Sequence, residues 1–154
     1  MNTKKILNGK VLRLSLLLLL FTGLTSSSKM AGNYNGLVVI THSQTSVGQL
    51  KKSVFEKMIF GEKQTWPNGK AVFIGLCKPT NPTGIQVAKD IFDMSANEFN
   101  KYWLGLVFEG KCKAPALFSD EDDLINFIAN TPNSIGVISE SSYKTKVKRI
   151  TINN

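Results

Sequence analysis

Hydrophobic residues occur along this chain in short runs with two alternating periodicities. Residues 37–41, LVVIT, form a continuous apolar run that is β-branched at its centre, which is typical of a strand buried on both faces. Residues 49–60 space their apolar side chains three to five residues apart, which predicts an amphipathic helix ended by Gly61. Residues 66–69, Trp-Pro-Asn-Gly, have the composition of a turn, and residues 71–76 predict the next strand.

Three further helices are predicted by their starting residues. Thr83 is a candidate N-cap for a helix at residues 84–92, because its hydroxyl can accept a backbone hydrogen bond. Ser95, with Glu98 three residues later, has the spacing of a capping box. Ser119 precedes an acidic first turn, which suits the positive end of a helix dipole. We therefore expect helices to begin at these positions.

The remaining apolar runs predict two more strands. Residues 135–139 follow a turn, and residues 147–152 alternate in polarity like an edge strand. Strands that alternate with helices indicate an α/β domain, with a mixed sheet flanked by helices. Four aromatic residues fall on the apolar stripes or at the turn and are predicted to be structural: Phe60, Trp66, Phe99 and Trp103.

The first 28 residues have the pattern of a signal peptide. An apolar core at residues 14–24 is followed by small residues and preceded by Lys4, Lys5, Lys10 and Arg13. This core is shorter than the roughly 20 residues that span a bilayer. We expect a signal peptide at residues 1–28 and one domain at 29–154, periplasmic or secreted. An uncleaved N-terminal anchor is the alternative.

Charge and composition narrow the function classes. Four of the 19 Lys and Arg lie in the leader, which leaves 15 against 11 acidic residues, a net charge of about +4. No basic stripe with interleaved aromatics appears, so no nucleic-acid partner is expected. His42 lies close to serines, but no G-x-S-x-G motif is present, so we expect no enzyme. No cofactor or metal motif is found, and Cys77 and Cys112 are equally compatible with a disulfide or two thiols.

The strongest candidate site is the loop Lys78-Pro-Thr-Asn-Pro-Thr-Gly. It joins a predicted strand to a predicted helix, and ligands of open α/β sheets bind beyond the carboxyl ends of strands. A helix N-terminus there attracts anions through its backbone N–H groups and its dipole. The expected ligand-binding residues of this loop are Thr80, Asn81, Thr83 and Gly84. The other interpretation is a well-capped helix after a rigid loop.

Three segments, in order, resemble one protein family. They are VFEKMIFGEKQTWPNGKAVFIGL at residues 54–76, IFDMSANEFNKYWLGLVFEGKCKAP at 91–115 and DDLINFIANTPNSIGVIS at 122–139. They look like the phosphate-binding-protein-like group of type II periplasmic solute-binding proteins, which serve ABC transporters. The resemblance implies a one-lobe member that binds a small oxyanion such as phosphate and assists transport. It places the anion-binding loop at residues 80–84 and implies a membrane transporter or sensor protein as partner.

A second loop is a candidate to complete this site, although helix capping by Thr45 or Ser46 is the favoured interpretation of it. Ser43 and Thr45 follow the first predicted strand and are possible donors to the same anion, because neighbouring parallel strands end on the same side of a sheet. The main loop has Lys78 as its one cation, and Pro79 and Pro82 remove two backbone donors. These departures weaken the case for phosphate specificity. The resemblance also implies that one lobe supplies only half of the family's cleft, so we expect weak anion binding unless a dimer or partner closes the site. The alternative is a ligand-free structural, docking or sensory module that kept the solute-binding fold.

Overall fold

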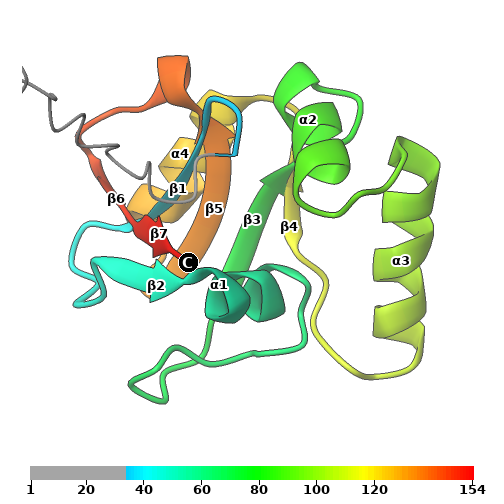
Figure 1. The fold of residues 1–154 in the computed structure, drawn as a ribbon, viewed down its shortest axis with the longest axis horizontal. Coiled ribbons are helices and arrows are strands. Elements are labelled where there is room, and N and C mark those ends of the chain that lie inside the picture. The colour runs from blue at the N-terminus through cyan, green and yellow to red at the C-terminus, as the bar shows by residue number, and fades with distance from the viewer. Residues whose placement is uncertain (1–33) are drawn as a thin grey trace, which may run out of the picture.

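The computed structural model describes residues 34–154, so the predicted signal peptide lies outside the described residues. A five-stranded sheet forms the centre of this part, with strand order β4-β3-β5-β1-β6 (Figure 1). The strands are β1 (Leu37–His42), β3 (Phe73–Cys77), β4 (Ala116–Phe118), β5 (Ser134–Ser139) and β6 (Val147–Arg149).

The central sheet is mixed. Strand β3 runs parallel to both β4 and β5, with Gly75 opposite Gly136. Strand β1 runs antiparallel to its neighbours β5 and β6, with Val39 opposite Val137. A separate pair of parallel strands joins β2 (Gln49–Lys51) to β7 (Thr151–Asn153). The predicted fold class, an α/β domain with a mixed sheet flanked by helices, is confirmed.

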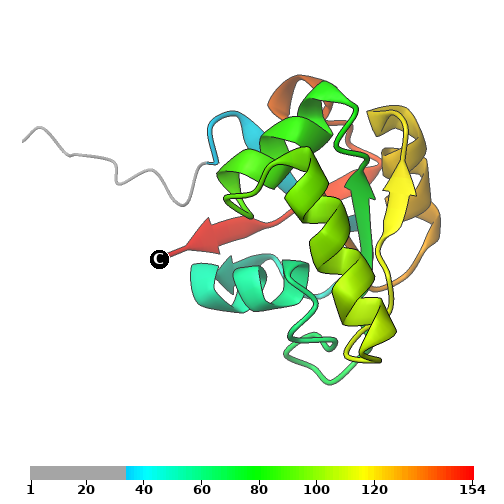
Figure 2. The same cartoon turned by 90° about the vertical axis from the view of Figure 1, so that its right-hand side faces the viewer.

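Helices cover both faces of the sheet. The helices are α1 (Lys52–Ile59), α2 (Pro82–Asp90), α3 (Ala96–Phe108) and α4 (Glu121–Asn130), with a short 3-10 turn η1 (Glu140–Ser142) after β5. Apolar residues of α1, α2 and α3 share one core cluster, whereas those of α4 belong to the other. Figure 2 shows α3 lying across the end of the molecule that carries β3 and β4. In residues 34–154 no helix combines the length and apolar character needed to cross a bilayer.

Strand β1 shows why the core has two halves. Leu37 and Val39 pack into the cluster beneath α1 and α2, whereas Val38 and Ile40 pack into the cluster beneath α4. Alternate side chains of a strand point to opposite faces, so each face of β1 is covered by helices. This confirms the prediction, made from the continuous apolar run, of a strand buried on both faces.

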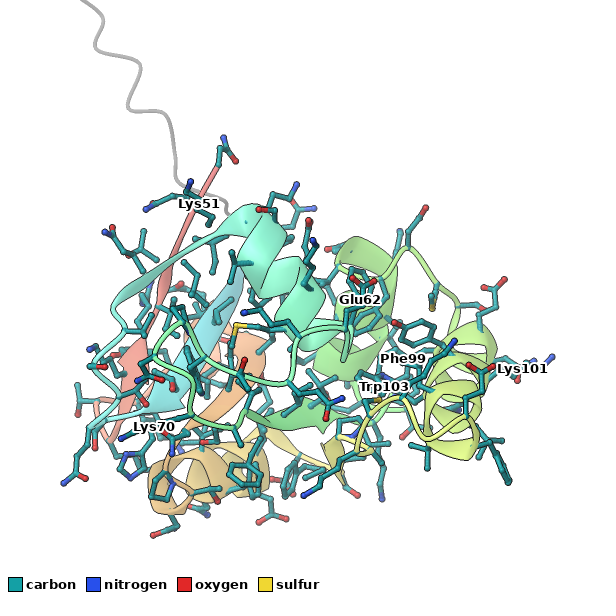
Figure 3. All side chains as sticks on the ribbon, turned by 90° about the horizontal axis from the view of Figure 1, so that it is seen from below. Lys51, Glu62, Lys70, Phe99, Lys101 and Trp103 are labelled. Atoms are coloured by element: carbon teal, nitrogen blue, oxygen red, sulfur yellow. The ribbon has the colours of Figure 1, made fainter. Side chains whose placement is uncertain are left out.

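The aromatic residues predicted to be structural lie in the core. Trp66, Phe99 and Trp103 are buried and Phe60 is half-buried. Phe99 and Trp103 lie close together on α3 (Figure 3), and each makes an edge contact with Phe92. Trp66 Nε1 donates a hydrogen bond of 2.8 Å to the carbonyl of Asn133, which fixes the predicted turn against the start of β5.

Several predicted boundaries are wrong for identifiable reasons. Residues 49–51 form β2 rather than the start of a helix, because Leu50 pairs with Ile152 of the distant strand β7. The predicted edge strand 147–152 is divided at Ile150 into β6 and β7, which belong to different sheets. The capping box at the start of α3 is confirmed. At the start of α4 the N-cap is Asp120 and not Ser119, since the Asp120 carboxylate accepts from the Asp123 N–H at 2.8 Å.

Candidate functional site

Three loops meet at the carboxyl ends of the parallel strands β3, β4 and β5. Lys78 begins the loop after β3, Ser119 follows β4, and Glu140–Ser142 follows β5. The first two loops are joined by hydrogen bonds: Lys78 Nζ donates to Ser119 Oγ at 3.1 Å, and Asn81 Nδ2 donates to the Ser119 carbonyl at 3.1 Å. In open α/β sheets this edge is where ligands bind. The predicted loop therefore lies at the carboxyl ends of the strands, where open α/β sheets commonly bind ligands.

The N-terminus of α2 is capped from within. Asn81, not Thr83, is the N-cap, because Asn81 Oδ1 accepts from the Thr83 N–H at 2.9 Å. Pro82 occupies the first helical position and has no N–H to offer. The sequence carries a signal of this cap, because proline favours the first helical position and here directly follows an Asn. Two of the backbone positions that would hold an anion are thus unavailable to a ligand.

Gly84 is required by the loop itself. A Cβ atom at this position would lie 2.0 Å from the carbonyl oxygen of Lys78, far inside any permitted contact. The close approach expected at this glycine is therefore made by the chain's own backbone. Thr83 is also buried, whereas Thr80 and Lys78 are exposed. Of the predicted loop residues, Thr80 and the partly exposed Asn81 remain open to a ligand, together with the Lys78 ammonium.

An acidic hollow of about 310 Å³ opens beside this loop. It is lined by Asn81, Asp120, Glu121, Asp122 and Ser142. Asp122 forms an ion pair with Lys144. At about 4 Å in water, each unpaired carboxylate opposes an anion by about 1 kcal/mol. The carboxylates at this opening therefore disfavour an anion beside the loop.

Glu121 lines this hollow and was not among the residues predicted for the site. Its carboxylate accepts hydrogen bonds from the Ser139 N–H at 2.5 Å, from Ser139 Oγ at 2.9 Å and from Ser142 Oγ at 2.5 Å. Burial acts to raise the pKa of Glu121, but hydrogen bonds from Ser142, Ser139 and Thr83 outweigh it and lower the pKa below 4.5. The donors come from β5, η1 and α2, so no local sequence pattern could have brought them together.

Acid should abolish the stability that Glu121 contributes. Because its pKa is lowered in the folded state, this contribution is present above pH 4.5 and is lost as the pH falls through the folded pKa. We expect Glu121→Gln to destabilise the protein by about 1 kcal/mol at pH 7, a low value because the carboxylate is partly solvated. Urea unfolding at several pH values should show the two proteins converging below pH 4.5. A difference that persists unchanged in acid would contradict this assignment, and Asp123→Asn is the matched control.

Ser43 and Thr45 do not lie at this site. Strand β1 is antiparallel to β5, and β5 is parallel to β3, so β1 ends at the opposite edge of the sheet from β3. Thr41 Oγ1 lies 3.0 Å from Thr45 Oγ1 and donates to the carbonyl of Ser134, where β5 begins. The expectation that the two loops lie side by side is wrong, because it assumed that β1 is parallel to β3. Ser43 and Thr45 are therefore not second-side donors to an anion at the loop after β3.

The two cysteines are thiols and do not form a disulfide. Cys77 is buried at the end of β3, and burial, with the carboxylates of Glu121 and Asp120, raises its pKa to about 12. Burial also raises the pKa of Cys112. A protonated thiol is a poor nucleophile. Among the described residues, no three His, Cys, Asp or Glu side chains are grouped so that they could hold a metal ion.

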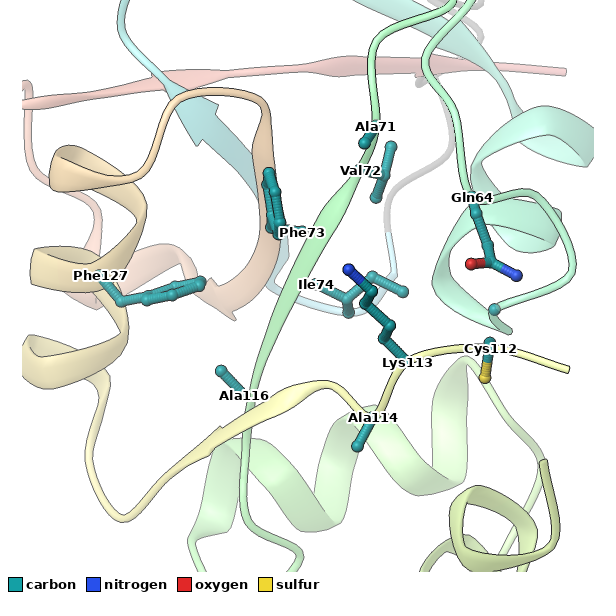
Figure 4. Close-up of a pocket in the computed structure, with 11 residues that line it drawn as sticks. Gln64, Ala71, Val72, Phe73, Ile74, Cys112, Lys113, Ala114, Ala116 and Phe127 are labelled. Carbon is teal, nitrogen blue, oxygen red and sulfur yellow. The ribbon is translucent and has the colours of Figure 1, made fainter. Parts of the chain in front are cut away.

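A larger hollow lies at the other end of β3. It has a volume of about 360 Å³ and includes Phe73, Ile74 and Phe127 among its lining residues (Figure 4). Cys112 and Gln64 lie on its far side from Phe127, and Gln64 Nε2 donates to the Lys111 carbonyl. The wall is mainly apolar and lacks the cluster of hydroxyl groups found at the carboxyl end. The polar candidate site therefore remains the edge where β3, β4 and β5 end.

Comparisons with known proteins give structural matches. No family model and no curated protein matches the sequence. A phosphate ABC transporter substrate-binding protein with bound phosphate, from Clostridium perfringens, matches with a TM-score of 0.57 at 15% identity over 76% of this chain and 44% of its own. An ABC-type phosphate transport receptor from Vibrio cholerae matches with a TM-score of 0.60 at 12% identity over 76% and 46%. PstS from Borrelia burgdorferi matches with a TM-score of 0.57 at 16% identity over 77% and 47%.

The chain spans less than half the length of the solved structures it matches. At these identities the likeness concerns the fold. The structural matches confirm, at the level of the fold, the family resemblance seen in the three sequence segments. The match covers between 44% and 47% of those chains, as expected of a one-lobe relative. The chain therefore has the fold of the phosphate-type solute-binding proteins of ABC transporters.

Proposed function

We propose that this protein is an exported, solute-binding-type protein that binds a small oxyanion such as phosphate and assists a membrane transporter or sensor protein. The observation that carries the proposal is the convergence of three polar loops at the carboxyl ends of β3, β4 and β5. The matching solved structures include one with bound phosphate, which supports the class of ligand. The protein acts by binding and not as an enzyme, in the periplasm or outside the cell.

The outer part of the site contacts the ligand in this proposal. Lys78 supplies the charge, and Thr80 and Asn81 supply hydrogen bonds. Hydrogen bonds to a charged group contribute about 1.5–3 kcal/mol each when they are sheltered from water. These residues lie on an exposed surface with carboxylates beside them, so the binding of this chain alone is weak. A partner that covers the loop would strengthen it by excluding water.

Calorimetry should detect this binding. We expect phosphate to bind the mature protein with a dissociation constant on the order of 1 mM, equivalent to about −4.1 kcal/mol. Lys78→Ala should weaken binding about tenfold, because it removes the ammonium at the loop. Lys89→Ala, an exposed lysine at the other end of α2, changes the net charge equally and should leave binding unchanged. Equal losses in the two variants would move the ligand away from this loop.

The second candidate is a docking module without a small ligand. It is favoured by apolar side chains that α3 and β4 leave exposed, namely Leu104, Val107, Phe108 and Leu117. Surface patches of this kind mark protein interaction sites. It is also favoured by the internal capping of α2, which leaves few donors for an anion. The absence of binding heat with both phosphate and sulfate would favour this second function over the first.

A further inference from the structure

The structure holds an oxyanion cradle that is already filled. Two hydroxyls and a backbone N–H, from Ser139 and Ser142, converge on one carboxylate at 2.5 to 2.9 Å. Ser139 Oγ also contacts Ser142 Oγ at 3.0 Å and Ser141 Oγ at 3.1 Å, so the donors are held together by their own contacts. A set of hydroxyls with one backbone N–H is the donor chemistry that recognises carboxylates and phosphates.

The group inside this cradle is part of the same chain. Glu121 is the first residue of α4 and follows the N-cap Asp120. Its carboxylate reaches across from the loop after β4 to the turn after β5. The neighbouring carboxylates have other contacts: Asp120 caps the Asp123 N–H, and Asp122 pairs with Lys144. Glu121 is thus the acidic residue of this turn whose carboxylate accepts the hydrogen bonds of Ser139 and Ser142.

We propose that the cradle of Ser139 and Ser142 is an oxyanion-binding site, and that Glu121 occupies it from within the chain and so excludes free phosphate. This inference rests on the proposed function only for the class of ligand, a small oxyanion. It adds a residue of the chain that regulates access to this edge of the sheet. An external oxyanion gains the inner donors only after the Glu121 carboxylate has left. In the wild-type protein, binding is therefore restricted to the outer residues of the loop after β3.

The test is a gain of binding. Glu121→Ala empties the cradle, and we expect formate, phosphate or sulfate to bind this variant at least tenfold more tightly than the wild-type protein in calorimetry. Glu121→Gln removes the charge but keeps a side chain of the same length in the cradle, so it should bind no better than wild type. Asp123→Asn, an equal change of charge on the same helical turn, should also show no gain. Adding Ser142→Ala to Glu121→Ala should abolish the gain.

Each result decides the proposal. A folded Glu121→Ala variant without a gain would overturn it, and so would an equal gain in Glu121→Gln or Asp123→Asn, since either would reflect charge and not occupancy. If Glu121→Ala is unfolded in plain buffer, formate or phosphate should refold it and raise its melting temperature. A variant that no oxyanion refolds would also contradict the proposal.

These results are distinct from the test of the proposed function. If the wild-type protein does not bind phosphate but Glu121→Ala does, the filled cradle stands and the proposed function of the wild-type chain fails. If wild-type binding depends on Lys78 and Glu121→Ala brings no gain, the proposed function stands and the filled cradle fails.

Discussion

Replacing Trp103 by alanine should lower the free energy of unfolding by about 3–5 kcal/mol. The side chain is 5% exposed and contacts the rings of Phe92, Phe99 and Tyr102. Its removal leaves a cavity between α3 and the end of α2 that the rigid core cannot fill. In the described part of the chain Trp103 Nε1 has no hydrogen-bond partner, so the loss is one of packing. Equilibrium unfolding in urea measures it.

Phe108 on the same helix provides the control. Its side chain is 83% exposed, so Phe108→Ala should change stability by no more than about 0.5 kcal/mol. A Trp103→Ala protein as stable as wild type would show that this tryptophan is not part of the core.

Gly84→Ala should destabilise the protein by about 3 kcal/mol and distort the loop after β3. The added methyl group would lie 2.0 Å from the Lys78 carbonyl oxygen and 2.7 Å from that of Cys77. Both atoms belong to the backbone at the end of β3, so relief requires that α2 move away from the sheet. Urea unfolding and thermal melting measure the effect.

The matched substitution is Gly105→Ala on α3. A Cβ atom there meets nothing within 4 Å, and alanine favours the helical conformation over glycine by about 1 kcal/mol. We therefore expect opposite signs: a loss of stability at Gly84 and a gain at Gly105. If both substitutions left the stability unchanged, α2 would not approach the end of β3 as closely as the structure shows.

Local patterns predicted the elements better than their arrangement. The run at residues 37–41 and the capping box of Ser95 and Glu98 were predicted correctly, because neighbouring residues carry those signals. The direction of β1 was not, since it depends on pairing with β5 near the other end of the chain. The same holds for β2, whose pairing with β7 overrides a helical pattern.

The candidate site was likewise predicted in part, from local sequence signals alone. The loop after β3 was predicted from its position between a strand and a helix, and the structure places it at the carboxyl ends of β3, β4 and β5. The cradle around Glu121 could not be predicted, because Ser139 and Ser142 lie 18 and 21 residues away, on β5 and η1. From the sequence, Glu121 was one of four acidic residues that suit a helix start. Only the folded chain distinguishes it from its neighbours.

The position of β1 has a consequence for how this chain folds during synthesis. Its hydrogen-bonding neighbours in the sheet are β5 and β6, which are made after nearly all of the other elements. A ribosome therefore releases β1 long before a partner strand exists. Contacts between residues so distant in sequence slow folding, because a long loop must close before any pairing is gained. The centre of the sheet is thus completed last, and folding that starts only once the C-terminal strands have emerged is the expected kinetic behaviour.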